Sequence, residues 1–156
     1  MKNRGILHAR IISTVVVMIF FLCCSTAHAE EYVSVTKDGV NIRSGPGTDD
    51  EILWEVFKGF PLKVTKKQNN WTQVMDFEGD TGWIYSPLLS SQTTLIVKVD
   101  IANMRVGAGK DYEIVASVKY GVVFTAIEKE GDWIRVRHDD GTSGWIYAKL
   151  LWPENF

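Results

Sequence analysis

Cysteine and histidine are scarce in this chain, and most of both lie at its start. Of 156 residues, only 2 are Cys and 3 are His. Both cysteines and two of the histidines precede residue 30, so the remaining sequence keeps His138 alone. A disulfide framework and a thiolate zinc site are therefore excluded from that part. A nucleophile–histidine catalytic unit would have one candidate base.

The chain also lacks an excess of basic charge. The first 29 residues hold 3 of the 17 basic residues and no acidic ones, which leaves 14 basic against 19 acidic residues, a net charge of −5. Residues 30–90 carry 6 basic and 10 acidic side chains, and residues 94–156 carry 8 and 9. Nucleic-acid-binding proteins present a basic surface. No nucleic-acid partner is predicted.

A hydrophobic run long enough to cross a bilayer is missing as well. The apolar segment Ile11–Cys24 has 14 residues, whereas a membrane span needs about 20. Three basic residues precede it, and Ala27-His28-Ala29 follows as a small-x-small cleavage pattern. This order predicts a signal peptide over residues 1–29 and export across the cytoplasmic membrane. The periplasm is favoured over the extracellular medium, and an uncleaved membrane anchor is the alternative to a signal peptide.

A duplication fills the rest of the chain. Residues 33–89 reappear as residues 95–151 at a constant offset of 62, without a gap, and 21 of the 57 paired positions are identical. A unit of roughly 60 residues can bury a core of its own. The sequence predicts a first domain over residues 30–90, a linker over 91–93, a second domain over 94–152 and a tail over 153–156.

Short alternating segments separated by turn residues make up each repeat. Tyr32–Thr36 and Trp71–Met75 alternate in the manner of strands with one buried face. Turns such as Asp140-Gly141 tolerate positive φ and favour hairpins. Only Ser86–Leu89 and Ala148–Leu151 favour a helical turn. Because closure removes open sheet edges, the predicted fold class is all-β, with two tandem five-stranded small barrels.

Positions that stay apolar in both repeats predict the two cores. The predicted pairs are Val40 with Ala102, Ile42 with Met104, Ile52 with Ile114, Val56 with Val118, Leu62 with Phe124, Val64 with Ala126, Val74 with Val136, Ile84 with Ile146 and Leu88 with Leu150.

Several motifs resemble the bacterial Src homology 3 domain family. The first repeat carries N-I-R-S-G-P-G-T over Asn41–Thr48, then Trp71, then G-W-I-Y over Gly82–Tyr85. The second carries N-M-R-V-G-A-G over Asn103–Gly109, with Trp133 and another G-W-I-Y. The resemblance covers nearly all of the chain after the signal peptide. It implies a five-stranded barrel, a non-catalytic role in exported proteins, and binding of cell-wall peptidoglycan or its peptides.

Strand alternation places several aromatic side chains on the outer face. Thr72 and Val74 share one face of their strand, which puts Trp71 on the other. Aromatic rings with polar tips suit peptide or sugar ligands, and an arginine can bind a ligand carboxylate through two parallel hydrogen bonds. The candidate ligand-binding residues are Trp71, Tyr85 and Arg43 in the first repeat, and Trp133, Tyr147 and Arg105 in the second.

Each of these candidates has a structural alternative. The rings could instead cover the barrel beneath the Gly45-Pro46-Gly47 loop, and this interpretation is favoured for Trp83 and Trp145. For Arg43, pairing with a nearby acidic residue is favoured over ligand contact.

No catalytic residue, metal or cofactor is predicted. His138 has no candidate serine in a strained turn, and a zinc hydrolase needs about three protein ligands. Asp49 and Glu51 lack the full set of oxygen ligands that calcium requires. The predicted function is an exported, non-catalytic binding module for peptidoglycan or cell-wall peptides. The alternative is an adaptor that binds an extended segment of an envelope protein.

Overall fold

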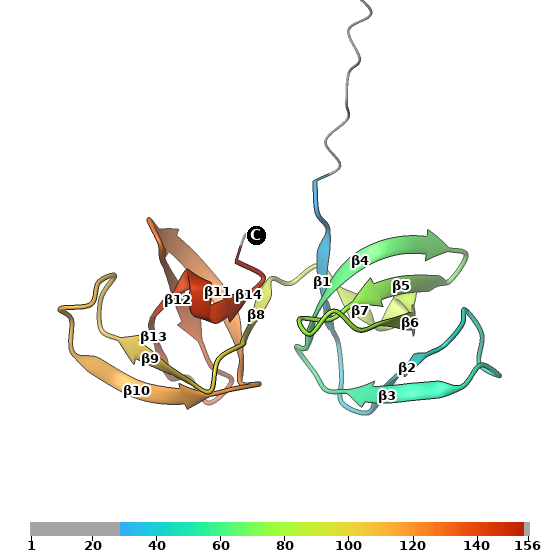
Figure 1. The fold of residues 1–156 in the computed structure, drawn as a ribbon, viewed down its shortest axis with the longest axis horizontal. Coiled ribbons are helices and arrows are strands. Elements are labelled where there is room, and N and C mark those ends of the chain that lie inside the picture. Colours follow the sequence, from blue (N-terminus) through green and yellow to red (C-terminus); the bar gives the residue numbers. More distant parts are fainter. Residues whose placement is uncertain (1–28, 155–156) are drawn as a thin grey trace, which may run out of the picture.

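The computed structural model describes residues 29–154, so nearly all of the predicted signal peptide and the last two residues of the tail lie outside the described part. Within that part, two antiparallel sheets of seven strands each account for the fold (Figure 1). No helix in residues 29–154 has the length and apolar character needed to cross a bilayer. The predicted all-β class with two Src-homology-3-like units is confirmed.

The first sheet takes its strands from one repeat. Its elements are β1 (Tyr32–Val35), β2 (Val40–Arg43), β3 (Ile52–Val56), β4 (Pro61–Gln68), β5 (Trp71–Met75), β6 (Thr81–Tyr85), the short 3₁₀ turn η1 (Ser86–Leu88) and β7 (Leu89–Ser90). Across the sheet the strand order is β3-β2-β6-β5-β4-β1-β7.

The second sheet repeats this arrangement. Its elements are β8 (Thr94–Val97), β9 (Ile101–Arg105), β10 (Ile114–Lys119), β11 (Val123–Glu130), β12 (Trp133–Arg137), β13 (Ser143–Tyr147), the 3₁₀ turn η2 (Ala148–Leu150) and β14 (Leu151–Trp152). The order β10-β9-β13-β12-β11-β8-β14 matches the first sheet strand for strand.

Each unit has seven strands instead of the expected five because chain segments at both ends of the repeat also pair. In the first unit, the two-residue β7 joins β1 through the pairs Ser34↔Ser90 and Val35↔Leu89. The hairpins form at the predicted turns, where Gly79 and Gly141 adopt φ of 94° and 92°. That left-handed region is accessible to glycine at little cost. The predicted helical turns are present as η1 and η2.

Five of the nine predicted core pairs are buried in both units. They are Val40 with Ala102, Ile42 with Met104, Leu62 with Phe124, Val74 with Val136 and Ile84 with Ile146. The prediction for Ile52 and Ile114 is wrong, because these side chains are 50% and 45% exposed. In the first unit, Ile42 pairs with Trp54 but Arg43 pairs with Ile52, so a β-bulge interrupts the alternation. The second unit has the same register shift. The side chains at the start of each edge strand, Ile52 and Ile114, therefore face solvent and do not enter the core.

The two cores fill equivalent spaces with different side chains. Trp54 packs against the first core, and Ala116 occupies the equivalent position in the second. Around Ala116 the second core has Met104 and Phe124, where the first has Ile42 and Leu62. The first core thus uses the large side chain of Trp54 from the edge strand, and the second core uses the longer Met104 and the larger Phe124.

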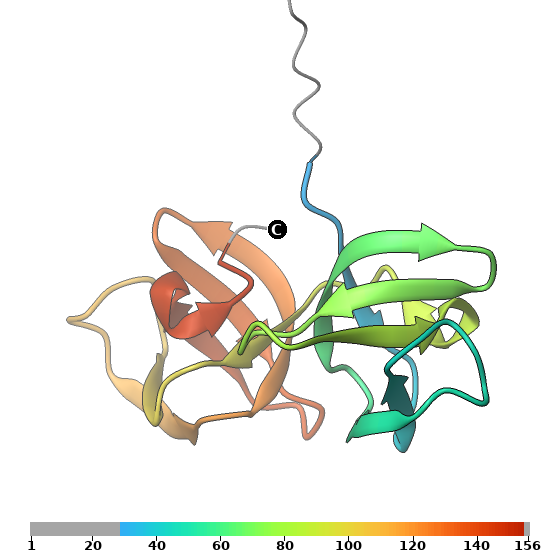
Figure 2. The ribbon, with the colours of Figure 1, turned by 45° about the vertical axis from the view of Figure 1, so that its right-hand side comes forward.

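The two units pack against each other through β8 (Figure 2). All four residues of β8 are buried. Leu95 and Val97 belong to the core of their own unit, whereas Ile96 belongs to the core cluster of the first unit. Trp152 also packs against that first cluster. One strand therefore contributes to two hydrophobic cores.

Candidate functional site

A groove of about 570 Å³ opens on the first unit. The predicted residues Trp71, Tyr85 and Arg43 all line it. Its remaining lining residues are Lys37, Gly39, Val40, Asn41, Gly47, Thr48, Asn70 and Leu88. The fold therefore brings together three side chains that come from three different strands.

Trp71 and Tyr85 form one wall of the groove because β5 and β6 pair in register at these two residues. Their rings meet edge to face, with centroids 5.7 Å apart and an interplanar angle of 63°. Trp71 is half-buried and Tyr85 is 41% exposed. Thr72, on the opposite face of β5, is buried and shares a hydrogen bond of 2.8 Å with the hydroxyl of Ser86. The bond between Thr72 and Ser86 holds β5 in place on its inner face, and the rings of Trp71 and Tyr85 stay partly exposed on its outer face.

Arg43 holds the loop that borders the groove. Its Nη1 donates to the backbone carbonyl of Asp50 at 2.7 Å. The expected partner was an acidic side chain, and the structure instead shows a carbonyl of the loop backbone. A guanidinium has five N–H donors in a planar fork, so this bond leaves donors for a ligand carboxylate. Arg43 is therefore placed both to anchor the loop and to contact a ligand.

The loop between β2 and β3 closes around a carboxylate. A Cβ added to Gly45 would lie 2.6 Å from Cγ of Asp50, and one added to Gly47 would lie 2.9 Å from its Oδ2. Only residues without a side chain allow this close approach. Glycine at both positions lets the loop fold tightly over Asp50, with Gly47 and Thr48 on the groove side.

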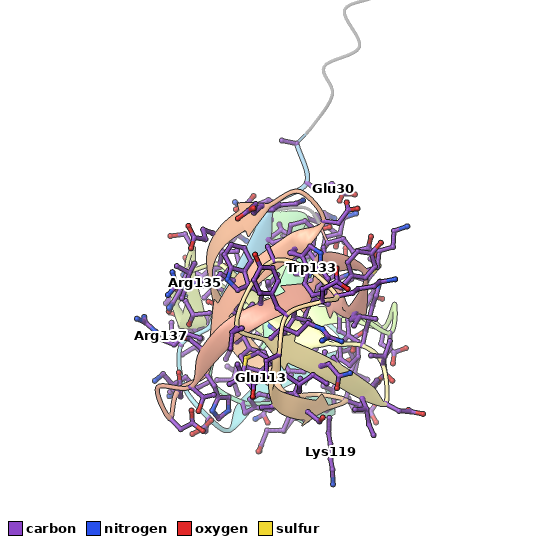
Figure 3. All side chains as sticks on the ribbon, turned by 90° about the vertical axis from the view of Figure 1, so that its left-hand side faces the viewer. Glu30, Glu113, Lys119, Trp133, Arg135 and Arg137 are labelled. Atoms are coloured by element: carbon purple, nitrogen blue, oxygen red, sulfur yellow. The ribbon has the colours of Figure 1, made fainter. Side chains whose placement is uncertain are left out.

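The second unit repeats the aromatic wall. Trp133 and Tyr147 pair in register, with ring centroids 5.6 Å apart. Trp133 is half-buried on the side of β12 where Arg135 and Arg137 are exposed (Figure 3). Arg105 donates from Nη1 to the carbonyl of Tyr112 at 2.6 Å, the same loop-anchoring bond as in the first unit.

Other parts of that region differ between the units. Val99 and Ile101 occupy the positions of Lys37 and Gly39. Inside the second loop, the ring of Tyr112 replaces a carboxylate, 2.6 Å from the place of a Cβ on Gly107. Asn103 accepts a hydrogen bond of 3.1 Å from Ser117 across the edge hairpin. The second unit therefore keeps the aromatic pair and loses the cation at the position of Lys37, while Lys110 takes the position of Thr48.

Trp83 and Trp145, for which a covering role was favoured, do not line the first groove. Trp83 is 8% exposed, and Nζ of Lys66 lies 5.8 Å from its ring centroid. Trp145 is half-buried. The covering role favoured for both agrees with these positions. The sequence interpretation did not identify Lys37, Asn70 or Leu88 as groove residues, since each lies at a strand or turn end where alternation gives no direction.

Three carboxylates come close together in the turn between β5 and β6. Oxygens of Asp76, Glu78 and Asp80 lie within 4.8 Å of one another. Asp76 is buried, and this burial raises its pKa. Its Oδ1 accepts the backbone N–H groups of Glu78 and Asp80, each at 2.9 Å. These bonds close the turn and account for the position of Asp76.

Comparison with known families identifies both units. The model of the family described as Bacterial SH3 domain matches residues 36–91 and again residues 98–153.

Among curated proteins, YrvJ of Bacillus subtilis, described as an N-acetylmuramoyl-L-alanine amidase, is 29% identical over 139 residues. That alignment covers 81% of this chain and 26% of YrvJ. The protein p60 of Listeria monocytogenes, described as an endopeptidase, is 29% identical over 105 residues, covering 65% of this chain and 22% of p60. The chain thus spans about a quarter of the length of the curated relatives it matches.

Solved structures give weaker similarities. An NlpC/P60 family protein from Bacillus cereus is 12% identical, with a TM-score of 0.36, and the match covers 77% of this chain and 55% of that one. NlpC2 from Trichomonas vaginalis is 16% identical, with a TM-score of 0.33, and the match covers 79% of this chain and 48% of that one. These scores are too low to establish a common overall arrangement.

Proposed function

This chain belongs to the bacterial SH3 domain family, and from that membership we propose that it is an exported, non-catalytic module that binds the peptide part of peptidoglycan. The observation that carries the proposal is the groove of the first unit, where Trp71, Tyr85 and Arg43 meet. Two curated relatives described as a cell-wall amidase and an endopeptidase support the same class of ligand.

The groove has the chemistry that a short wall peptide requires. Its volume of about 570 Å³ falls within the roughly 300–1,000 Å³ range of small-ligand sites. The rings of Trp71 and Tyr85 provide contact area at low entropic cost. Lys37 and Arg43 supply positive charge for the carboxylates of a stem peptide. The aromatic wall would contact the chain of the peptide while these cations select its acidic groups.

Catalysis is not part of the proposal. The one histidine in the described part, His138, is half-buried directly after β12, with its Nδ1 3.1 Å from the carboxylate of Asp140. It lines a different cavity from the Trp71 groove. The module would bind wall material without altering it, and export would follow from the predicted signal peptide.

A second candidate function rests on the outer edges of the two sheets. In the strand orders, β3 and β10 lie at the sheet edges. They expose Ile52, Leu53, Ile114 and Val115 by 42% to 50%. An exposed apolar edge strand can pair with an extended segment of another protein. This surface would serve the alternative function, an envelope adaptor.

Sedimentation of residues 30–156 with purified cell-wall sacculi tests the main proposal. Trp71→Ala is expected to weaken binding by about tenfold or more, because truncating a central aromatic contact typically costs about 2 kcal/mol or more. Ile127→Ala, which shortens an exposed side chain elsewhere on the surface, is the matched control and is expected to bind like wild type. Circular dichroism verifies that each variant is folded.

Two results would contradict the proposal. Undiminished sedimentation of Trp71→Ala would show that the groove is not the site. Absence of sedimentation, together with envelope-protein capture that Leu53→Lys abolishes, would favour the adaptor function instead.

A further inference from the structure

The two units meet through an interface with internal two-fold symmetry. Nζ of Lys58 lies 3.8 Å from the carboxylate of Asp139. At the offset of 62, Lys58 corresponds to Tyr120, and Asp139 corresponds to Phe77. The rings of Tyr120 and Phe77 are in contact, with centroids 5.4 Å apart. Each contact is therefore the symmetric counterpart of the other, which is the pattern of an isologous interface.

One flank of this interface is closed by large side chains. The rings of Tyr32 and Trp152 meet edge to face at 5.3 Å. Beside them, Ile96 is 1% exposed and belongs to the first core cluster. The hydroxyl of Tyr120 adds a hydrogen bond of 2.5 Å to Glu78. Apolar and aromatic groups thus fill the space between the two units on this side.

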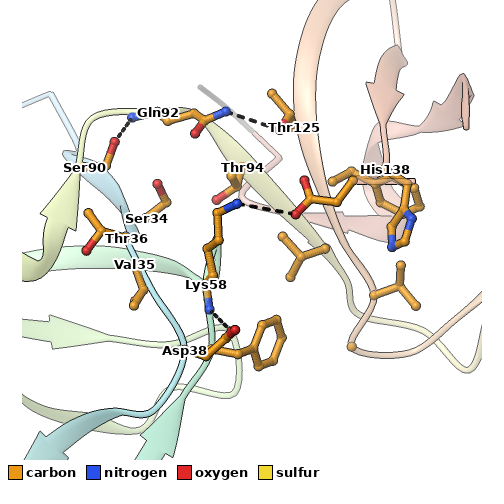
Figure 4. Close-up of a pocket in the computed structure, with 17 residues that line it drawn as sticks. Ser34, Val35, Thr36, Asp38, Lys58, Ser90, Gln92, Thr94, Thr125 and His138 are labelled. Carbon is orange, nitrogen blue, oxygen red and sulfur yellow. Dashed lines mark hydrogen bonds and ion pairs between the residues drawn. The ribbon is translucent and has the colours of Figure 1, made fainter. Parts of the chain in front are cut away.

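The symmetric flank has small hydroxyl residues in the same places. Ser34 corresponds to Ile96, Ser90 to Trp152 and Thr94 to Tyr32. All three line an open cleft of about 590 Å³ between the units (Figure 4). The cleft exists because the side chains that close one flank are replaced by much smaller ones on the other.

The acidic and basic side chains around this cleft already have partners inside the protein. Lys58 faces Asp139 across the cleft, and the carboxylate of Asp38 accepts the backbone N–H of Lys58 at 2.8 Å (Figure 4). His138 has Asp140 3.1 Å from its Nδ1. A charged ligand would compete with these contacts, so the cleft favours a neutral one.

Hydroxyl groups are what the cleft offers to a ligand. Five hydroxyl side chains line it: Ser34, Thr36, Ser90, Thr94 and Thr125. Thr36 donates to the carbonyl of Leu88, whereas Ser90 and Thr125 accept from Gln92 and keep their own protons to donate. Thr94 is 5% exposed, and its buried Oγ1 has no hydrogen-bond partner among the described residues. A buried hydroxyl without a partner is destabilising, and a bound polar group could supply the missing bond. Phe57, 43% exposed, adds an apolar surface at the rim.

We propose that this inter-unit cleft is a second binding site, whose ligand is a neutral, polyhydroxylated chain, that is, a short glycan segment. Each protein hydroxyl can both donate and accept a hydrogen bond, as each sugar hydroxyl can. The exposed ring of Phe57 suits the apolar face of a sugar ring. The site shares no lining residue with the Trp71 groove. This proposal can therefore be tested independently of the function proposed above.

An NMR titration of residues 30–156 with two soluble tetrasaccharides tests the site. The N-acetylglucosamine tetramer represents wall-type glycan, and cellotetraose is a neutral chain without acetamido groups. Saturable shifts are expected at the backbone amides of Ser34, Thr94 and Thr125, with the Trp71 indole signal unchanged. Shifts with both sugars support recognition of hydroxyls in general, and shifts with the first alone support an acetamido glycan.

The repeat itself supplies the blocking variants. Ser90→Trp and Thr94→Tyr introduce the side chains that the opposite flank already accommodates, so each is expected to fold and to reduce sugar affinity at least tenfold. Ser91→Trp adds the same ring at an exposed neighbour that does not line the cleft and is expected to bind normally. Thr94→Val removes only the unpaired hydroxyl, and is expected to weaken binding about threefold to tenfold without lowering the melting temperature.

Three results would overturn the proposal. The first is the absence of saturable shifts with either sugar up to about 10 mM, a concentration above the millimolar range of weak specific binding. The second is binding that Ser90→Trp and Thr94→Val leave unchanged. The third is a neutral tetrapeptide of alanine shifting the cleft amides when neither sugar does, which would assign the cleft to peptides. Failure of Trp71→Ala to affect sacculus binding would contradict only the groove proposal.

Discussion

The two SH3 units have the same strand order but present different surfaces. Identical positions include the aromatic pairs Trp71–Tyr85 and Trp133–Tyr147, which have nearly the same ring geometry. The differing positions include residues at the groove and at the contact between the units. Lys37 borders the first groove, and the equivalent residue of the second unit is Val99. Trp152 of the second unit packs against the first unit, and its equivalent in the first repeat is Ser90.

This difference indicates how two copies of one fold can carry different contact surfaces. The identical positions include turn glycines such as Gly79 and Gly141, because a side chain there would strain a positive φ. The outward positions can change independently in each copy. In this chain the second unit carries side chains that dock it onto the first, while the first has a groove bordered by Lys37 and Arg43.

In both units, close packing is found at the glycine of the G-W-I-Y motif. A Cβ on Gly82 would lie 2.3 Å from Cγ2 of Ile42, and one on Gly144 would lie 2.6 Å from Cγ of Met104. Because overpacking a core costs typically about 1–3 kcal/mol, Gly82→Ala and Gly144→Ala are each expected to destabilise by about that amount. At Gly82 the nearest atom belongs to the stiff, β-branched Ile42, whereas at Gly144 the backbone oxygen of Arg105 also lies 2.8 Å from the added Cβ. We therefore expect comparable losses at the two positions, measured by urea unfolding.

A double variant separates this explanation from a general loss of glycine. Adding Ile42→Met, which installs the residue of the second unit, is expected to recover part of the stability that Gly82→Ala removes. If the double variant were no more stable than Gly82→Ala alone, the contact with Ile42 would not be the cause.

The docking of the two units depends on Trp152. Trp152→Ser introduces the residue found at the equivalent place in the first repeat, and removes the ring that packs on Tyr32 and the first core. Because the ring is partly buried, the expected loss is about 2 kcal/mol, below the roughly 3–5 kcal/mol of a fully buried tryptophan. Hydrogen exchange should become faster in the first unit, although the change lies in the second. Faster exchange confined to the second unit would refute this coupling.

The charge difference beside the two aromatic walls is tested by an exchange. Lys37→Val gives the first groove the residue of the second unit, and is expected to weaken binding of an acidic stem peptide about threefold to tenfold, through loss of one favourable charge. Isothermal titration at two salt concentrations should show a weaker salt dependence for the variant. The reverse change, Val99→Lys, should not weaken binding. Equal affinity of wild type and Lys37→Val would show that the cation does not contribute.

The smallest expected effect is on pH dependence, where the two units should behave in opposite ways. Burial raises the pKa of Asp76 above its ordinary value of 3.8. The native state then keeps this proton longer than the unfolded state does, so the free energy of unfolding decreases as pH rises from about 3.8 through the raised pKa. Asp76→Asn should remove that decrease, because an amide retains the acceptor oxygen without a charge.

Asp140 shows the opposite shift. The backbone N–H of Thr142 donates to its carboxylate at 2.8 Å and lowers its pKa. The free energy of unfolding should therefore rise as pH increases toward the ordinary value of 3.8, and Asp140→Asn should reduce that rise. Urea unfolding of both variants between about pH 3 and pH 7 measures the two slopes. Slopes of the same sign would contradict the assignment.

Much of the fold could be predicted from the sequence because its signals are local. Turn glycines such as Gly79 set the hairpins, and alternation along Trp71–Met75 predicted which side chains face the core. The prediction was wrong for Ile52 and Ile114, where a β-bulge shifts the register at the edge of each sheet. Such a bulge depends on the pairing strand, and the alternation of a single strand does not contain that information.

The candidate site was less accessible to sequence reasoning. Trp71, Tyr85 and Arg43 could be named because they lie on alternating strands or in a family motif. Their convergence on one groove depends on how three strands pair. The loop carbonyl bonded to Arg43 is a backbone group, and its position depends on the folded loop.

The duplication, the strand and turn pattern and many of the residues that fill the two cores can be predicted from the sequence alone, because these depend on neighbouring residues and on side-chain polarity. The tertiary structure decided how the two copies meet. The same interface is sealed by Tyr32, Ile96 and Trp152 on one flank and left open on the other, where the corresponding residues are Thr94, Ser34 and Ser90. Packing between residues far apart in the chain decides which of these side chains face each other. A local sequence pattern does not predict such packing.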